Sequence, residues 1–370
     1  MPQPTKQPRA NVRIVDIARH LGVSARTVSQ ALSAHEGSTT RISPDTAQKI
    51  QELAARWNYR PDISARAMKG RMLKQAGILT ESDFGPRRHH PVIEMPAILG
   101  LNSFLQEHDW HLNIIEDKGI RDPSSLLPRY LRERFLDGVV VASSSAVRDT
   151  ALAADFERIK MRAVFLNVPG EVNCITLDDR HGVSLATRHL LEQGHTRIAF
   201  VGNQSTHHSH RLRLAGFQST MRSAGLPTLA YTLDKKTEPL DYQLRMEAHA
   251  INGHDFIESF YTKERPTALV CYDDTVALRL MTALQQAGFS IPVDVSIVGY
   301  NDMPFVDLIH PSLTSVRSDF YAMGRAAGEL LLKLIKGPKA SHPSVLFKPE
   351  LIVRGSTRPP RARASHPVAS

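Results

Sequence analysis

The N-terminal fold follows from the sequence Val12-Arg13-Ile14-Val15-Asp16-Ile17-Ala18-Arg19-His20-Leu21-Gly22-Val23-Ser24-Ala25-Arg26-Thr27-Val28-Ser29-Gln30-Ala31-Leu32. Its apolar residues recur at helical spacing, first at Ile14, Ile17, Ala18 and Leu21, then at Val28, Ala31 and Leu32. Gly22 gives the backbone the freedom for a tight turn after the first helix, and Ser24 is a good N-cap for the second. Two short helices joined by such a turn predict a helix–turn–helix.

A third helix is predicted to follow. Ser43-Pro44-Asp45 supplies an N-cap, a proline at the first helical position and an acid in the first turn, and apolar residues continue to Trp57. Pro61 disfavours a helix at the residue before it and therefore ends this element. Asp62 can cap a short further helix that runs to about Met68.

These motifs resemble the DNA-binding headpiece of the lactose and galactose repressor family of bacterial transcriptional regulators. The matching pieces are Val-Asp-Ile-Ala-x-x-Leu-Gly-Val-Ser-x-x-Thr-Val-Ser at 15–29, Ile-Ser-Pro-Asp-Thr at 42–46 and Asn-Tyr-Arg-Pro-Asp at 58–62. The resemblance implies that the second helix enters the major groove. It also implies that the short helix after Pro61 is a hinge, which folds on DNA and kinks the minor groove with an inserted apolar side chain.

Carried over by position, the DNA-binding residues are Arg13, Ser24, Ala25, Arg26, Thr27, Ser29, Gln30, Tyr59, Ala65 and Met68. Arg26 is the best candidate for reading a guanine, because its fork matches O6 and N7. Met68 takes the place of the leucine that the family commonly inserts. Gln30 and Asp62 stand where the family usually has Arg and Asn, and the loop 33–41 is longer than usual, so the operator sequence stays open.

From Gln75 onward, short apolar strands alternate with helical patterns. Strands are predicted at 76–79, 112–115, 138–141, 163–166, 173–177, 197–201, 268–271 and 295–298. This alternation predicts parallel, doubly wound α/β sheets, in which ligands bind beyond the carboxyl ends of the strands. Gly324 and Gly328 fall within a predicted helix, 320–335, and are read as packing positions.

The same region resembles the family's sensor domain, which is similar to a periplasmic sugar-binding protein with two lobes. The matching pieces are 191–199, 211–217, 273–277, 298–302 and 311–316. By position, the effector-binding residues are Arg213, Asp273, Asn301, Ser209, His207, Asn167 and Leu177. Such a set suits a hydroxyl-rich or carboxylate-bearing metabolite, such as a sugar or a sugar acid. The alternative for Arg213 is a surface salt bridge, and for Asp273 and Asn301 it is capping at strand ends.

The expected architecture is therefore a helix–turn–helix domain plus a two-lobed α/β domain. The expected limits are 12–61 for the headpiece, 62–74 for the hinge and linker, and 75–356 for the effector-binding and dimerisation domain. The first lobe takes about 75–177 and 317–342, and the second about 178–312 and 343–356. The tail, 357–370, is expected to be disordered because it is rich in Pro, Arg and Ser.

Charge agrees with a nucleic-acid partner at one end of the chain. The net charge is +9; residues 1–75 carry 13 Lys and Arg against 5 Asp and Glu, and 354–370 carry four Arg and no acid, so the middle is 9 − 8 − 4 = −3. Cys174 and Cys271 lie in apolar strands and read as buried thiols of a reducing cytoplasm. No apolar run is long enough for a membrane span, and no secretory signal is visible.

The whole pattern predicts a cytoplasmic homodimer that represses transcription from a near-palindromic operator under the control of the effector. A cofactor, a metal site and catalysis are not expected, since no phosphate loop, dinucleotide fingerprint or nucleophile elbow occurs. The histidines at 207, 208 and 210 lack matching Cys or acid ligands. A solute-binding protein without a role in transcription stays open as the alternative, and a sugar-processing enzyme is the more distant one.

Overall fold

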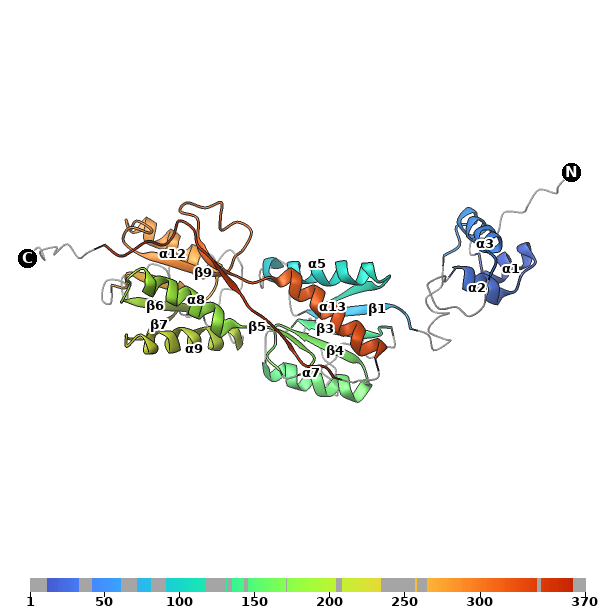
Figure 1. The fold of residues 1–370 in the computed structure, drawn as a ribbon, viewed down its shortest axis with the longest axis horizontal. Helices are drawn as coiled ribbons and strands as arrows, with labels where there is room; N and C mark the ends of the chain where they lie inside the picture. The colour runs from blue at the N-terminus through green and yellow to red at the C-terminus, as the bar shows by residue number, and fades with distance from the viewer. Residues whose placement is uncertain are drawn as a thin grey trace, which may run out of the picture. The chain divides into compact units, whose positions relative to one another are not determined.

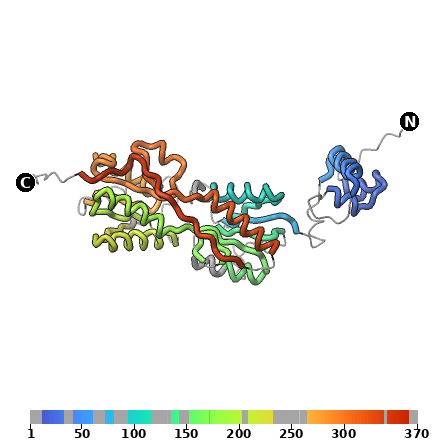
Figure 2. The backbone as a smooth tube through the Cα atoms, in the orientation of Figure 1, coloured from blue at the N-terminus to red at the C-terminus, as the bar shows by residue number. Residues whose placement is uncertain are grey.

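The computed structural model describes residues 12–32, 42–60, 72–80, 91–116, 131, 135–142, 146–170, 172–203, 208–233, 257, 265–337 and 341–361. The chain divides into two compact units, Met1–Met72 and Leu73–Ser370. Each unit has its own hydrophobic core. Figures 1 and 2 trace the backbone of both units. Within the described residues, no helix combines the length and the apolar content that crossing a membrane requires.

The first unit is a three-helix domain made of α1 (Ile14–Leu21), α2 (Ala25–Leu32) and α3 (Pro44–Arg56). Gly22 ends α1 in the left-handed conformation at φ 66°, and Ser24 accepts a hydrogen bond from the Thr27 backbone N–H at 3.0 Å. Ser43 caps α3 in the same way. Buried side chains from all three helices form the core, namely Ile17, Ala18, Val28, Ala31, Ile50, Leu53 and Ala54. The predicted helix–turn–helix is confirmed.

The second unit contains two lobes, each built on a six-stranded sheet. The first sheet has the order β11-β5-β4-β3-β1-β2, and the second β12-β10-β9-β8-β6-β7. The strands of the first sheet are β1 (Gln75–Thr80), β2 (His111–Glu116), β3 (Gly138–Ala142), β4 (Arg162–Leu166), β5 (Cys174–Leu177) and β11 (Val345–Phe347). Those of the second sheet are β6 (Ile198–Asn203), β7 (Leu229–Leu233), β8 (Ala268–Cys271), β9 (Ser296–Asn301), β10 (Thr314–Arg317) and β12 (Glu350–Ile352).

Helices cover both faces of these sheets, as parallel strands require. The first lobe has α5 (Pro91–Glu107), α7 (Ala146–Ile159) and α13 (Phe320–Lys336), and the second has α8 (Asp179–Glu192), α9 (His208–Ser223) and α12 (Asp274–Gln286). Along β3, Val139 and Val141 join the cluster that includes Phe156 of α7, whereas Val140 joins the cluster that includes Leu331 of α13. Burial on both faces explains why this strand is apolar at successive positions. The predicted fold class is confirmed.

The helices α5 and α13 lie side by side along the first lobe (Figure 1). Gly324 of α13 lies against the carbonyl oxygen of Ala97, and Gly100 of α5 against that of Tyr321, so that a Cβ at either glycine would overlap the facing backbone. Gly328 lies against the ring of Phe104. The packing role expected for Gly324 and Gly328 is confirmed.

The chain passes between the lobes three times: from β5 to α8, from β10 to α13 and from β11 to β12. Asp178 and Asp319 cap the helices that follow the first two passages. The Asp178 backbone N–H donates to the carbonyl of Phe347 at 2.8 Å, so the first and third passages are joined by a hydrogen bond. We call these three segments the crossings.

Several expected boundaries were wrong. β11 belongs to the first sheet, although 343–356 was assigned to the second lobe, and β10 keeps Arg317 in the second sheet. Strand pairing within each sheet decides to which lobe β10 and β11 belong. A three-residue strand such as β11 leaves little periodicity to detect in the sequence. Leu73, expected in the linker, is buried against the first lobe, where its N–H donates to Asp137.

Residues 357–361, expected to belong to the disordered tail, are held against the second lobe. Residues 357–361 are described, and the Arg358 carbonyl lies 2.9 Å from Nε2 of His195 and accepts from Ser296 Oγ at 3.1 Å. These backbone contacts with the second lobe hold a segment whose composition alone resembles disorder. The hinge helix at 62–68 and residues 362–370 lie outside the described residues.

Candidate DNA-binding face and effector site

The helix α2 presents a polar face on the side opposite to its buried Val28 and Ala31. Ser24, Ala25 and Arg26 are exposed, and Thr27, Ser29 and Gln30 are half-buried. Because the buried side chains fix how α2 sits in the three-helix core, this face is held in a defined orientation. A rigid helix with a short-chain polar face and a long basic side chain matches what a major groove accepts.

Three of the predicted DNA contacts, Ser24, Thr27 and Tyr59, already have partners within the headpiece. Ser24 Oγ lies 2.8 Å from Thr27 Oγ1, besides capping α2. Tyr59 packs half-buried against the core, and its N–H donates to the Ala54 carbonyl. Arg13 is exposed at the start of α1. Ala65 and Met68 lie outside the described residues, so the hinge contacts stay a prediction.

The predicted effector residues gather at the carboxyl ends of parallel strands. Asn167 follows β4, Leu177 ends β5, Asp273 follows β8 and Asn301 ends β9. Ser209 and Arg213 lie in the first half of α9, after β6, and His207 lies outside the described residues. These strand ends are where ligands bind in sheets of this type. The backbone of Asn167, in the first lobe, lies close enough to His208, in the second, to oppose through a hydrogen bond the lowering of the ring's pKa by burial. The two sets of strand ends therefore lie near each other at this point.

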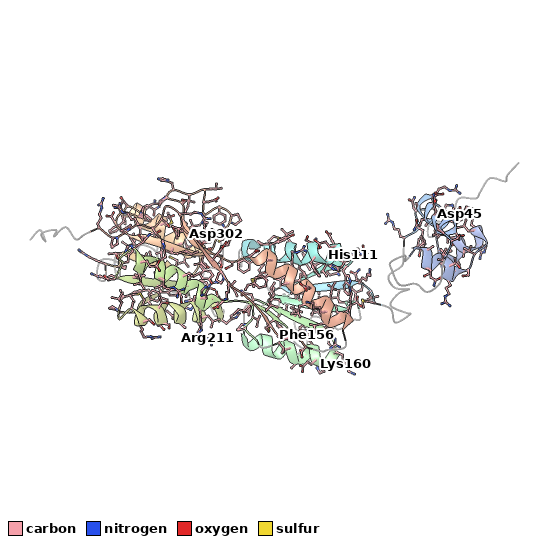
Figure 3. The ribbon with its side chains drawn as sticks, in the orientation of Figure 1. Asp45, His111, Phe156, Lys160, Arg211 and Asp302 are labelled. Atoms are coloured by element: carbon pink, nitrogen blue, oxygen red, sulfur yellow. The ribbon has the colours of Figure 1, made fainter. Side chains whose placement is uncertain are left out.

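Arg213 has a different environment from the one expected of a ligand-holding arm. Its side chain is 4 % exposed, Nε donates to Asp179 Oδ1 at 2.7 Å, and Nη1 donates to the Tyr272 carbonyl at 2.6 Å. The guanidinium also lies 3.6 Å from the centre of the Tyr300 ring. The salt bridge left open from the sequence exists, but it is buried. By contrast, Arg211, two residues earlier on α9, is exposed (Figure 3).

Burial raises the pKa of Asp179, and the charge and hydrogen bonds of Arg213 oppose that rise. Burial and the nearby Arg213 lower the pKa of His208 to about 4, so His208 is neutral at pH 7. Ser209 Oγ lies 2.8 Å from the Tyr272 hydroxyl. Around Arg213, the side chains therefore form a buried, mostly neutral polar cluster.

Two amides carry unused hydrogen-bonding capacity. Asn167 and Asn301 both have left-handed backbones, at φ 56° and 101°, and the side-chain oxygen of each is buried without a donor among the described residues. A buried acceptor without a donor is costly, so both positions suit a ligand that donates hydrogen bonds. Asp273 caps α12, since its Oδ1 accepts a hydrogen bond from the Val276 N–H at 2.8 Å. Capping was the alternative role predicted for this residue.

Sequence reasoning missed Asp179, Tyr272, Tyr300 and His208. Tyr272 and Tyr300 each directly precede a predicted ligand residue, which is a signal that was present in the sequence. Asp179 offered none, because it lies 34 residues from Arg213 along the chain. Cys174 and Cys271 are buried free thiols, as predicted. Across the described part of the chain, no three His, Cys, Asp or Glu side chains converge as metal ligands do.

Comparison with known proteins agrees with both halves of this geometry. Residues 13–62 match the family described as bacterial regulatory proteins, lacI family, and 187–357 match the periplasmic binding protein-like domain. The chain is 30 % identical over 352 residues to the HTH-type transcriptional regulator MalR of Streptomyces coelicolor, covering 93 % of this chain and 96 % of the relative. It is 27 % identical over 348 residues to the HTH-type transcriptional repressor PurR of Vibrio vulnificus, covering 93 % and 98 %.

The fold is similar to that of the lac repressor dimer bound to operator and the anti-inducer ONPF. The TM-score is 0.76 at 24 % identity, over 94 % of this chain and 99 % of that one. The two units of this chain thus occur together, in the same order, in a protein of known fold. The chain belongs to the LacI family of bacterial regulatory proteins, and it is a DNA-binding transcriptional regulator.

Proposed function

We propose that this regulator is a homodimeric repressor that binds a near-palindromic operator and is controlled by a small, neutral, hydroxyl-rich effector held between the two lobes. The observation that carries the proposal is that one chain contains both an exposed recognition helix, α2, and a two-lobed domain with polar residues at its strand ends. The lac repressor structure, solved as a dimer with operator and a small molecule, supports the same division of labour.

The chemistry of the strand ends favours a neutral effector, such as a sugar, over a sugar acid. Asp179 already neutralises the charge of Arg213 at 2.7 Å, and two amide oxygens lack donors among the described residues. Hydroxyl groups donate to such acceptors, whereas a carboxylate brings only further acceptors.

A dimer is supported by apolar side chains left exposed on the first lobe. Met95 and Leu99 lie one turn apart on α5, and the backbone of Tyr321 packs against Gly100, next to Leu99. Leu99 is 53 % exposed and Tyr321 43 %. A cluster of this kind commonly marks a protein interface. A two-fold dimer would place two headpieces on two half-sites, which is why the operator is proposed to be near-palindromic.

The test is a selection from random duplex DNA with the full chain at fixed salt, repeated with a panel of neutral sugars and of sugar acids. We expect one near-palindrome to be enriched, and its recovery to change with a neutral sugar. Arg26→Ala should relax the preference for guanine by about 1–3 kcal/mol. Arg19→Ala, which removes an exposed arginine of α1, is the matched control.

Failure of the selection to enrich any sequence would contradict operator recognition. A response to sugar acids alone would contradict the neutral effector while leaving DNA recognition intact.

A further inference from the structure

The loop after β9 has an unusual backbone. Asn301 and Asp302 are consecutive non-glycine residues with left-handed φ angles, 101° and 54°. Such conformations cost free energy and persist only where the surroundings hold them. Because Asn301 is a proposed effector contact, whatever holds this loop also places that contact.

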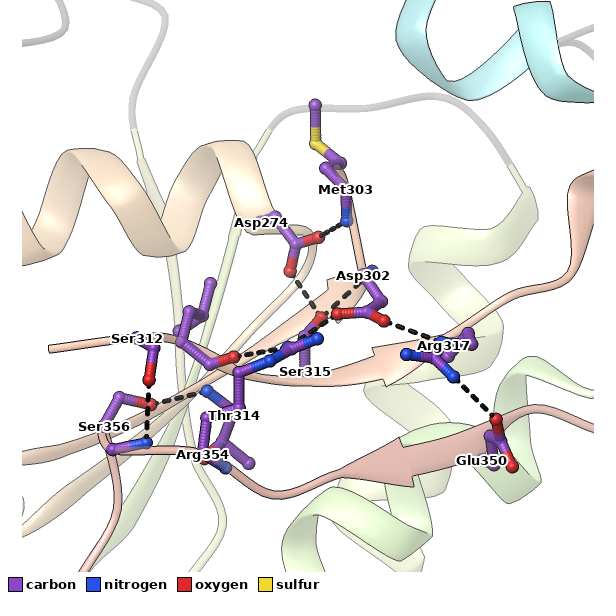
Figure 4. Close-up of polar contacts among 12 residues, drawn as sticks. Asp274, Asp302, Met303, Ser312, Thr314, Ser315, Arg317, Glu350, Arg354 and Ser356 are labelled. Atoms are coloured by element: carbon purple, nitrogen blue, oxygen red, sulfur yellow. Dashed lines mark hydrogen bonds and ion pairs between the residues drawn. The ribbon is translucent and has the colours of Figure 1, made fainter. Parts of the chain in front are cut away.

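The backbone of the loop is fixed from within the second lobe (Figure 4). The Asp302 N–H donates to Ser315 Oγ at 3.1 Å, and Ser315 Oγ donates to Asp274 Oδ1 at 2.6 Å. The Met303 N–H donates to Asp274 Oδ2 at 2.8 Å. One buried carboxyl group and one hydroxyl therefore hold two consecutive backbone N–H groups of the loop.

The Asp302 carboxylate connects the loop to two arginines. Arg317 Nε donates to Oδ2 at 2.7 Å, and Arg354 Nη1 lies 2.6 Å from Oδ1 as an ion pair that is not aligned as a hydrogen bond. Arg317 also reaches Glu350, with Nη1 3.2 Å from Oε1. Asp302 is 5 % exposed, so water competes little for its oxygens.

Arg317 and its second partner, Glu350, both lie next to crossings. Arg317 ends β10, three residues before α13 begins in the first lobe, and Glu350 begins β12, three residues after β11 ends there. Arg354, by contrast, also donates to the Leu313 carbonyl within the second lobe. Arg317 therefore joins the loop that carries Asn301 to two of the three crossings, at the second-lobe ends of the β10-to-α13 and β11-to-β12 segments.

We propose that the Asp302–Arg317 ion pair, extended by Glu350, transmits the position of the Asn301 loop to the crossings and so sets the orientation of one lobe relative to the other. Asp302 and Arg317 are positioning residues, and the inference rests on the proposed function only in treating Asn301 as an effector contact. Arg317 is 46 % exposed, so the pair adds little to stability, and its importance lies in the geometry that it fixes.

The test measures lobe orientation directly. Spin labels are placed in the full chain through Glu157→Cys on α7 and Gln286→Cys on α12, which are exposed sites in different lobes; the native thiols are buried. Excess unlabelled chain ensures that only distances within one chain are read. We expect one narrow distance distribution for the parent protein and a shifted or second population for Arg317→Gln and for Asp302→Asn.

Further variants separate the ion pair from general damage. The double variant should move the distance by less than the sum of the two single variants, because both remove the Asp302–Arg317 contact, although each also removes one further ion pair, to Arg354 or to Glu350. Arg317→Lys keeps the charge and should restore part of the parent distribution. Lys333→Gln breaks a surface ion pair of equal length within α13, 2.7 Å from Lys333 Nζ to Glu329, and should leave the distance unchanged.

The same variants are then titrated with the selected operator without added sugar. Operator affinity is expected to change by about fivefold or more, the lower end of typical coupling between sites. Distances in Arg317→Gln and Asp302→Asn equal to those in Lys333→Gln would overturn the inference, whatever the DNA result. Shifted distances with unchanged operator affinity would support the ion pair's role in setting lobe orientation and would overturn the proposed control of operator binding through the two lobes.

Discussion

The guanidinium of Arg213 shows how one residue can be both buried and charged. Its Nε lies 2.7 Å from Asp179 Oδ1, its Nη1 2.6 Å from the Tyr272 carbonyl, and it stacks on Tyr300. A buried ion pair gains stability only when its remaining hydrogen bonds are also satisfied. The hydrogen bonds of Arg213 are largely satisfied here. Removing only one partner of the ion pair should therefore destabilise the fold far more than removing both.

Arg213→Met is expected to destabilise the second unit by about 3–5 kcal/mol, because it leaves the Asp179 carboxylate buried without its cation. Asp179→Asn combined with Arg213→Met should cost less than the sum of the two single changes, since neither charge then stays buried alone. Urea unfolding followed by circular dichroism measures both. Full additivity would mean that the two side chains stabilise the fold independently.

Asp274 makes stability depend on pH. Burial raises its pKa from 3.8 to about 7, opposed by hydrogen bonds from Ser315 and the Met303 backbone and reinforced by Asp273 and Asp302. Between pH 4 and 7 the unfolded chain has released this proton while the folded chain keeps it. The folded state therefore binds more protons, and its stability falls as pH rises through this window.

Asp274→Asn should remove that decline, on the order of 4 kcal/mol between pH 4 and 7, because an amide does not titrate. The measurement is the free energy of unfolding of parent and variant at several pH values, with Glu329→Gln, an exposed acid on α13, as the control. The stability advantage of the parent over the variant should shrink as pH rises. A constant difference would show that Asp274 keeps an ordinary pKa.

At the scale of elements, two glycines determine how closely α5 and α13 approach. A Cβ at Gly324 would overlap the Ala97 carbonyl, and that obstacle is backbone, not the end of a flexible side chain. Gly324→Ala is therefore expected to push the helices apart and to destabilise the first lobe by about 1–3 kcal/mol, although alanine favours helices. Thermal unfolding measures the loss, with Glu329→Ala as a surface control on the same helix. A stabilised Gly324→Ala protein would contradict the close contact.

The elements that the sequence predicted well were those with strong local signals. The headpiece helices carried caps at Ser24 and Ser43 and a glycine at the first turn, and each is found as predicted. The strands β7, β10, β11 and β12 were not predicted. β11 and β12 have only three residues each, which carry no usable periodicity, so only their partners define them. Long-range pairing, not propensity, decided those elements.

At the scale of the whole molecule, the exposed apolar side chains of α5 and α13 are proposed to join two chains. We expect light scattering to give twice the chain mass of 41.1 kDa for the full protein. Leu99→Lys, which places a charge where Leu99 is 53 % exposed, should shift the population toward monomer and weaken operator binding by the loss of one half-site. Thr282→Lys, on exposed α12 surface, is the control. A parent protein that is monomeric would remove the basis for a palindromic operator.

The sequence by itself determined the helix–turn–helix and the alternation of strands and helices in the second unit, because caps, turn glycines and apolar periodicity act over a few neighbouring residues. The candidate effector residues at the strand ends were carried over by position from the resemblance to the family. Only the tertiary structure decided what those strand-end residues contact. Arg213 meets Asp179 across 34 residues, and Asp302 meets Arg317 and Arg354 across 15 and 52. Such partners depend on which strands lie side by side, and strand order is set by packing of the whole sheet, which no local pattern records.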